Sequence, residues 1–238
     1  MSDPLPAPTP ERWQAVDAYL SGLFVGADDA LDAARADQDA AGLPPIEVAA
    51  VHAKLLSLLV RMSGARRVLE IGTLGGYSTI VLARAVGERG SVVSLEAEPR
   101  HAAVARRNLE RAGVSARVRI EVGLAAEVLP TLAGPFDFVF IDADKESTTQ
   151  YLEHAARLAR PGAVVVVDNA VRAGRVADDA VVDAQVDGMR RGLAMLADDP
   201  RFDATAIQTL DAKGWDGVAI AIVGDSAGPA AGDPSRAH

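Results

Sequence analysis

Residues 68–79 read Val68-Leu69-Glu70-Ile71-Gly72-Thr73-Leu74-Gly75-Gly76-Tyr77-Ser78-Thr79 and join an apolar run to a glycine-rich turn. The apolar run is typical of a strand that is buried on both faces, as in a parallel sheet. A periodic segment that begins at Ser78 predicts a helix after the turn. A strand, a glycine turn and a helix in this order let the backbone approach a nucleotide-like ligand closely, although a tight turn without a ligand explains the same glycines.

The spacing of these glycines differs from that of the dinucleotide-binding fingerprint. A fingerprint that starts at Gly72 needs glycine at positions 74 and 77, where this chain has Leu74 and Tyr77. The turn therefore disfavours an NAD-dependent oxidoreductase, which stays the second enzyme hypothesis.

Composition limits the classes of protein to which the chain can belong. Its 238 residues are 49% hydrophobic and 24% charged, as expected for one large α/β domain. A net charge of −9 argues against a nucleic-acid partner. The absence of cysteine excludes disulfides, thiolate metal sites and cysteine nucleophiles. Because no signal peptide and no apolar run of membrane length are visible, we expect a cytoplasmic protein without a membrane partner.

Hydrophobic periodicity predicts a doubly wound α/β domain that is preceded by helices. Apolar spacing favours helices near 13–25, 28–42 and 48–62, and from residue 66 onward strands alternate with helices. The link 211–216 between the last two strands is so short that it permits a hairpin and no parallel crossover. We expect a disordered arm over 1–12, a single domain over 13–223 and a disordered tail over 224–238. The predicted strands cover residues 66–71, 91–96, 117–122, 136–141, 163–167, 203–210 and 217–223.

Acidic residues follow several of the predicted strands, at the end of the sheet where open α/β folds bind ligands. Glu96 comes about twenty residues after the glycines, where a carboxylate suits the two hydroxyls of a ribose. Asp142 ends the fourth strand and Asp168-Asn169 ends the fifth. If these strands are neighbours, two carboxylates and an amide oxygen converge on one divalent cation. The alternatives are a solvated loop acid for Glu96 and helix caps for the two aspartates.

Three separated motifs resemble one known family in order and spacing. They resemble the cation-dependent S-adenosylmethionine O-methyltransferases, which include catechol and caffeoyl-CoA O-methyltransferases and small bacterial members. The similarity runs from about Leu43 to Val223 and is specific for the family, though not for an acceptor. The motifs are Leu69-Glu70-Ile71-Gly72-Thr73-Leu74-Gly75-Gly76-Tyr77-Ser78, Phe140-Ile141-Asp142-Ala143-Asp144-Lys145 and Asp168-Asn169.

The resemblance implies a fold, a cofactor and a set of site residues. The implied fold is the Rossmann-like class I methyltransferase fold, a mostly parallel seven-stranded sheet of order 3-2-1-4-5-7-6 with strand 7 antiparallel. A divalent cation, Mg²⁺ or else Ca²⁺ or Mn²⁺, would be held by Asp142, Asp168 and Asn169, with Lys145 as general base and Asp142 beside it as a second catalytic residue. The residues implied in binding S-adenosylmethionine are Val48, Glu70, Gly72, Thr73, Gly76, Tyr77, Ser78, Glu96, Gly123, Ala125, Asp142, Asp144 and Tyr151.

The same resemblance predicts methylation of one hydroxyl of a catechol-like or other vicinal-hydroxyl phenolic small molecule. One departure is Thr148, which stands where characterised animal and plant members usually have tyrosine. Arg172 and Arg175 favour an acidic acceptor or simply a solvated approach to the next helix. Acidic charge disfavours methylation of nucleic-acid bases, and a non-catalytic cofactor-binding protein is the alternative that is not an enzyme.

Apolar residues ahead of the first strand predict a homodimer. The helices ahead of the first strand carry more apolar positions than a complete doubly wound core should need. These positions are Trp13, Leu20, Leu23 and Leu31. The family that the chain resembles is also mostly dimeric.

Overall fold

One mixed sheet organises the chain in the computed structural model, which describes residues 9–224. Its seven strands run in the order β3-β2-β1-β4-β5-β7-β6. The first five strands pair in parallel, whereas β7 is antiparallel to both β5 and β6. The predicted strand order and the antiparallel hairpin are therefore confirmed. The strands are β1 (Arg67–Ile71), β2 (Ser91–Glu96), β3 (Val118–Val122), β4 (Phe136–Ile141), β5 (Ala159–Asp168), β6 (Phe202–Asp211) and β7 (Gly214–Val223).

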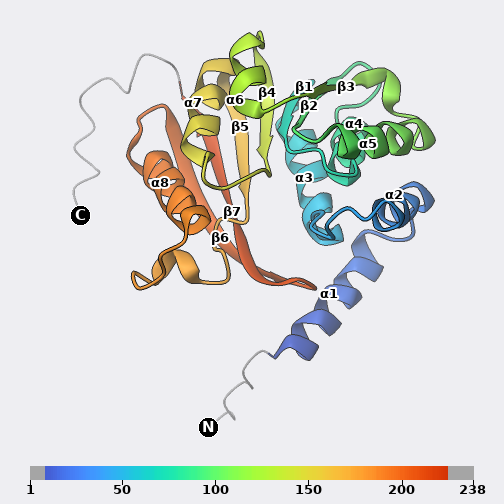
Figure 1. Ribbon diagram of the computed structural model, residues 1–238, viewed down its shortest axis with the longest axis horizontal. Helices are drawn as coiled ribbons and strands as arrows, with labels where there is room; N and C mark the ends of the chain where they lie inside the picture. The colour runs from blue at the N-terminus through green and yellow to red at the C-terminus, as the bar shows by residue number, and fades with distance from the viewer. Residues whose placement is uncertain (1–8, 225–238) are drawn as a thin grey trace.

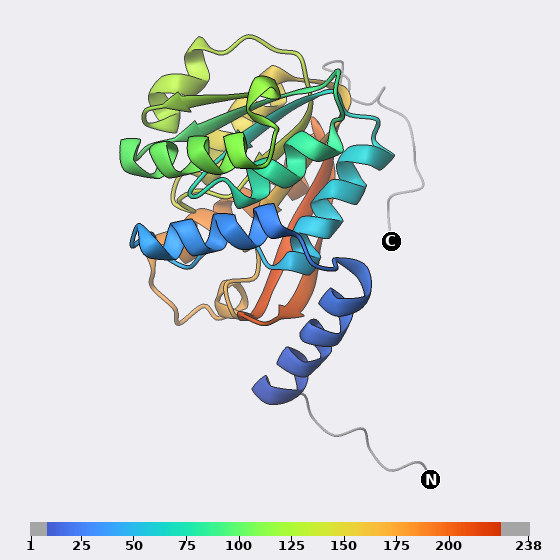
Figure 2. The same cartoon turned by 90° about the vertical axis from the view of Figure 1, so that its right-hand side faces the viewer.

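Helices cover both faces of the sheet (Figure 1). The helices α2 (Asp29–Ala40), α3 (Ala50–Met62), α4 (Tyr77–Ala85) and α5 (Pro99–Arg111) pack on one face. The helices α6 (Ala125–Val128), α7 (Thr148–Leu158) and α8 (Ala184–Asp198) pack on the other. Short 3₁₀ turns cover Ser115–Arg117, Leu129–Thr131 and Arg175–Ala177. A further helix, α1 (Pro10–Phe24), extends away from this body (Figure 2).

The central strand β1 supplies side chains to two separate hydrophobic cores. Leu69 and Ile71 belong to the core under α7 and α8, and Val68 belongs to the core under α3 and α4. Alternation of this kind follows from the period of two along a strand. Because both faces are covered, β1 reads as a nearly continuous apolar run, which is the pattern the sequence displays.

Element boundaries differ from the sequence prediction in three places. The helix α1 begins at Pro10, inside the predicted arm, and residues 1–8 and 225–238 lie outside the described residues. The strand β5 begins at Ala159, ahead of Pro161 and Gly162, because its pairing with β4 shifts register between Phe136 and Phe138 and so accommodates these residues. The last link is shorter than predicted, since β6 and β7 leave only residues 212–213 between them.

Within residues 9–224, no helix combines the length and the apolar character that crossing a membrane requires.

Candidate active site

A cleft of about 730 Å³ lies at the carboxyl ends of the parallel strands. Its wall includes Gly72, Glu96, Gly123, Asp142 and Asn169, each of which ends or directly follows a different strand. The segment between α2 and α3 closes another side through Pro44–Val48. The cleft therefore occupies the place where open α/β sheets bind ligands.

The glycine turn brings the backbone of β1 against the end of β4. At Gly72 the backbone has φ of 102°, and a Cβ atom there would lie 2.0 Å from the carbonyl oxygen of Asp142. Only glycine tolerates both the conformation and the contact. Gly76 caps α4 with φ of 86° but does not line the cleft, since its Cα faces Ala105 of α5.

The carboxylate of Glu96 holds the glycine turn and is not a solvated loop acid. Its Oε2 accepts hydrogen bonds from the backbone N–H groups of Thr73 (3.2 Å) and Leu74 (2.7 Å), and its Oε1 accepts one from Glu98 N (3.0 Å). Nδ1 of His101 lies 3.3 Å from Oε1. Each carboxylate oxygen has two lone-pair sites, so the Thr73 and Leu74 N–H groups fill Oε2. One site on Oε1 remains for a ligand hydroxyl or for His101.

The carboxylate of Glu70 lies behind the wall of the cleft. It is fully buried and accepts hydrogen bonds from the hydroxyls of Ser78 (2.6 Å), Thr79 (2.5 Å) and Ser94 (2.6 Å). Burial raises the pKa of Glu70 to about 7, although these hydroxyls act in the opposite direction. Glu70 does not line the cleft, but its carboxylate holds the hydroxyl of Ser78, which does. A contact between Glu70 and the cofactor stays a prediction.

Two acidic strand ends and one amide lie together, as the neighbouring strands β4 and β5 require. Nζ of Lys145 is 3.0 Å from Asp142 Oδ1, and Lys145 is only 4% exposed. Asp168 lies deeper than the cleft wall at 5% exposed. Burial, followed by the negative charge of Asp142, raises the pKa of Asp168 to about 7. Asn169 has left-handed backbone (φ 57°) and lines the cleft.

The donor set of Asp142, Asp168 and Asn169 fits a divalent cation. Neither aspartate caps a helix, because α7 follows Ser147 and α8 is capped by Asp183. Hard oxygen donors suit Mg²⁺, Ca²⁺ and Mn²⁺. Two carboxylates that repel one another in a partly buried place gain from a cation between them. In residues 9–224 no cluster of three or more His, Cys, Asp or Glu side chains is arranged for a metal, so the third protein donor would be an amide.

Lys145 is held from both sides of its backbone. Its N–H donates to Gln185 Oε1 of α8 (2.9 Å), and its carbonyl oxygen accepts a hydrogen bond from the Thr148 hydroxyl (2.7 Å). Thr148 is 1% exposed, so the residue that replaces the family tyrosine fixes the turn that carries Lys145.

Asp144 and Tyr151 form a pair on the cleft wall. The Tyr151 hydroxyl donates to Asp144 Oδ1, and Ser147 N donates to Oδ2 at 3.1 Å. Burial raises the pKa of Asp144, but the hydrogen bonds from Ser147 and Tyr151 outweigh it and hold the pKa below its usual range. Burial and the neighbouring Asp144 raise the pKa of Tyr151, which keeps its proton on the hydroxyl.

The loop after Asn169 is fixed by residues that the sequence did not single out. Oδ1 of Asp216 accepts the backbone N–H groups of Val171 (3.1 Å), Arg172 (2.9 Å) and Gly217 (2.9 Å). Asp216 lies in β7, 44 residues from Arg172, so no local pattern could indicate the contact. The rule that places ligand-binding acids at strand ends applies to parallel strands, and Asp216 lies in an antiparallel one.

Most of the predicted site residues meet in one cleft. Glu70, Gly76 and Asp168 do not line it, for the reasons given above. The predicted residues that do line it are Val48, Gly72, Thr73, Tyr77, Ser78, Glu96, Gly123, Ala125, Asp142, Asp144, Lys145, Tyr151 and Asn169.

Comparison with known proteins agrees with this arrangement. Residues 28–218 match the model of a family described as O-methyltransferase. The chain belongs to the O-methyltransferase family. This O-methyltransferase is 57% identical over 209 residues to the catechol O-methyltransferase of Mycobacterium tuberculosis, covering 87% of this chain and 94% of the relative. It is 46% identical over 215 residues to the catechol O-methyltransferase of Niastella koreensis, covering 89% of this chain and 97% of the relative.

Solved structures show the same fold for this O-methyltransferase. The Bacillus cereus O-methyltransferase in complex with SAH superposes with a TM-score of 0.88 at 46% identity, over 90% of this chain and 100% of that chain. The Streptomyces achromogenes O-methyltransferase TomG in complex with SAM gives the same TM-score and identity over 92% and 100%. The family assignment sets aside the NAD-dependent alternative.

Proposed function

We propose that this O-methyltransferase transfers the methyl group of S-adenosylmethionine to one hydroxyl of a catechol-like acceptor, with a divalent cation as second cofactor. The observation that carries the proposal is the meeting of Lys145, Asp142 and Asn169 with the glycine turn in one cleft. The names of the two relatives support a catechol acceptor, and the bound molecules of the two solved structures support the methyl donor.

The glycine turn and its surroundings would bind the methyl donor. Ser78, oriented by the buried Glu70, offers its side chain to the methionine end, which needs polar partners. Glu96 offers the remaining lone-pair site of its Oε1 to a ribose hydroxyl. Gly123 and Ala125 leave room on the wall for a flat ring such as adenine. Together these contacts would fix the direction in which the methyl group faces. Holding the methyl group in line with the attacking oxygen lowers the barrier to transfer.

Asp142, Asp168 and Asn169 would hold the cation and Lys145 would handle the proton. A free phenol has a pKa near ~10 and is a poor nucleophile at neutral pH. A divalent cation held there would act as a Lewis acid and would lower the pKa of the reacting hydroxyl. In its neutral form Lys145 accepts the phenol proton, and its place beside Asp142 is set by Gln185 and Thr148. The hydroxyl oxygen then takes the methyl group from sulfur, and S-adenosylhomocysteine leaves.

A transfer assay with labelled S-adenosylmethionine and catechol tests the proposal. We expect EDTA to abolish turnover and Mg²⁺ to restore it. Asp168→Ala should lose activity together with metal dependence, whereas Asp198→Ala, an exposed acid at the end of α8, should behave like the wild type. Full methylation by metal-stripped protein in excess EDTA would contradict the proposed role of the cation.

The role of Lys145 is tested separately from that of the cation. Lys145→Ala should keep its affinity for S-adenosylhomocysteine and lose about 10²–10⁴-fold in turnover, as removal of a general base typically does. Calorimetry measures the first quantity and the transfer assay the second. Turnover within a factor of a few of wild type would remove Lys145 from the mechanism.

A further inference from the structure

Arg172 is a cation on the cleft wall whose guanidinium has no partner among the described residues. Of the other basic side chains on the wall, Lys145 pairs with Asp142, and Nδ1 of His101 lies 3.3 Å from Oε1 of Glu96. The guanidinium of Arg172 forms no ion pair and no hydrogen bond within residues 9–224, and its Nε is buried without a partner. A buried donor without a partner is costly, because it has lost its water and gained nothing in exchange.

Hydrogen bonds fix the backbone of Arg172, and the fixed backbone sets where its side chain begins. Arg172 has φ of 54°, a left-handed conformation that a side chain of its size rarely adopts. Asp216 stabilises this conformation by accepting the N–H of Arg172 (2.9 Å), and Ala170 N donates to Gly217 O (2.8 Å). Strain that surrounding contacts maintain is typical of functional positions.

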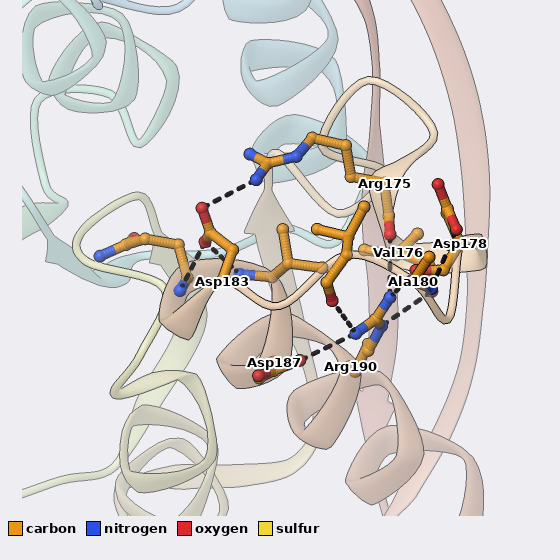
Figure 3. Close-up of polar contacts among 10 residues, drawn as sticks. Arg175, Val176, Asp178, Ala180, Asp183, Asp187 and Arg190 are labelled. Atoms are coloured by element: carbon orange, nitrogen blue, oxygen red, sulfur yellow. Dashed lines mark hydrogen bonds and ion pairs between the residues drawn. The ribbon is translucent and has the colours of Figure 1, made fainter.

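The other arginines that contact this loop have structural partners. Figure 3 shows Arg190 of α8 donating to the carbonyl oxygens of Val176 and Arg175 at 3.1 Å and to Asp187 Oδ1 at 2.8 Å. Arg175 pairs with Asp183 at 2.8 Å, and Asp183 in turn caps α8. The loop is therefore fixed without the guanidinium of Arg172, which leaves that group available for a ligand.

The position of Arg172 assigns it to the acceptor and not to the methyl donor. It follows Asn169 by three residues, after β5, whereas the glycine turn of the donor site follows β1. Arg172, Asn169 and Gln185 line the same cleft, and Gln185 also holds Lys145. An acceptor whose hydroxyls lie between Asp142, Asn169 and Lys145 thus has Arg172 on its own side of the cleft.

We infer that the acceptor is a catechol that carries a carboxylate, and that Arg172 binds this carboxylate. This inference rests on the proposed function. The two Nη groups of a guanidinium lie side by side, in the spacing of the two oxygens of a carboxylate. Such a pair would neutralise the unpaired charge of Arg172 on the cleft wall and would select acidic acceptors over neutral ones of the same shape. Arg172 is then a specificity residue for the methyl transfer.

Kinetics with a matched pair of acceptors test the inference. The probes are 3,4-dihydroxybenzoate and its methyl ester, which keep the same two hydroxyls, at saturating Mg²⁺ and S-adenosylmethionine. For the wild type we expect kcat/KM for the acid to exceed that for the ester by about ten- to a hundredfold, the range of hydrogen bonds to charged groups. Arg172→Gln should lose this preference by lowering kcat/KM for the acid and leaving the ester unchanged.

Two controls separate specificity from structure. Arg191→Gln removes an exposed positive charge on α8 and should keep the wild-type preference. Arg172→Lys keeps the positive charge but lacks the paired N–H donors of a guanidinium. It should therefore retain part of the preference for the acid over the ester. Equal kcat/KM for acid and ester in the wild type would overturn the inference, as would an equal loss on both in Arg172→Gln. Absence of turnover on either probe and on catechol itself would instead count against the proposed function.

Discussion

Two buried glutamates stand on either side of the glycine turn and bind different partners. Among the described residues, Glu70 accepts hydrogen bonds only from side-chain hydroxyls, those of Ser78, Thr79 and Ser94. Glu96 accepts them from backbone N–H groups of the turn itself. Replacing Glu96 should therefore disturb the backbone of the turn, whereas replacing Glu70 should remove a buried charge and release the hydroxyl of Ser78 that it holds.

Glu96→Ala should weaken the binding of S-adenosylhomocysteine by about ten- to a hundredfold, because a charged acceptor of hydroxyl hydrogen bonds is lost. The N–H groups of Thr73 and Leu74 also lose their acceptor. Glu96→Gln keeps one carbonyl oxygen at that place and should lose less. Titration calorimetry gives both affinities, and an unchanged affinity in the alanine variant would exclude Glu96 from the donor site.

Glu70→Gln should remove a pH dependence from the free energy of unfolding. Burial raises the pKa of Glu70 from 4.5 to about 7 in the folded protein. The protonated form is thus favoured by folding, so this contribution is fully present below pH 4.5 and is lost as the pH rises through 7. The expected loss relative to Glu70→Gln is on the order of 3 kcal/mol.

Urea unfolding at a series of pH values from 4.5 to 8, in EDTA, measures this loss. The exposed Glu127→Gln serves as the control, since it removes a carboxyl without burial. Curves for the wild type and Glu70→Gln that run parallel over this range would show that Glu70 keeps its ordinary pKa.

At the scale of elements, α8 reaches Lys145 because two of its residues are glycine. A Cβ atom at Gly188 would lie 2.2 Å from the carbonyl oxygen of Lys145, and one at Gly192 would lie 2.4 Å from Cγ2 of Thr148. The contact between α7 and α8 is therefore as close as backbone allows at the turn that carries Lys145. Larger residues would separate the helices and move that turn.

Gly188→Ala should destabilise the protein by about 1–3 kcal/mol through overpacking and should also lower turnover. Gly22→Ala is the matched control, because Gly22 lies in α1 and a Cβ atom there meets nothing within 4 Å. The control should change stability little or raise it by up to ~1 kcal/mol, since alanine favours the helix. Thermal unfolding measures the stability of the two variants, and the transfer assay measures their turnover. Equal stability and turnover in Gly188→Ala and Gly22→Ala would contradict the close packing of α8 on Lys145.

Elements were predictable from sequence where the signal is local. The apolar run of β1 predicted a strand that is buried on both faces, and the short link after Asp211 predicted the antiparallel hairpin. The strand order was implied by the family resemblance and not by these local patterns. Contacts that depend on register were not predictable. Ser94 binds Glu70 because β1 and β2 pair these two residues side by side, and nothing in either strand alone fixes that register. Asp216 was missed for the same reason, since its partners lie far away in the chain.

At the scale of the whole molecule, α1 has no buried residue and presents an apolar face. Val16, Tyr19, Leu23 and Phe24 are 55–67% exposed and share one side of the helix by their spacing. Figure 2 shows α1 extending from the body of the molecule. Leu31 was counted in the sequence analysis among the apolar residues that predict a dimer. It is instead buried in the core under α2 and α3. We expect a second copy of the chain to cover the face of α1.

Light scattering at micromolar concentration should give twice the chain mass of 24.7 kDa. Replacing both Tyr19 and Leu23 by glutamate should give the mass of one chain, because two charges would be buried in the interface. Val182→Glu is the control, since Val182 is 93% exposed and distant in sequence from α1. A wild type of 24.7 kDa at this concentration would contradict the dimer.

The position of β7 makes the acceptor side of the cleft the last part to form during synthesis. It is the final strand of the chain, yet it lies between β5 and β6 and carries Asp216, which holds the loop after Asn169. The glycine turn and Glu96 lie in the part of the chain from β1 to β4, which leaves the ribosome earlier. We therefore expect a chain that is still being made to contain the residues that would bind the methyl donor before it contains Asp216. The loop that carries Arg172 gains its acceptor only once β7 has emerged.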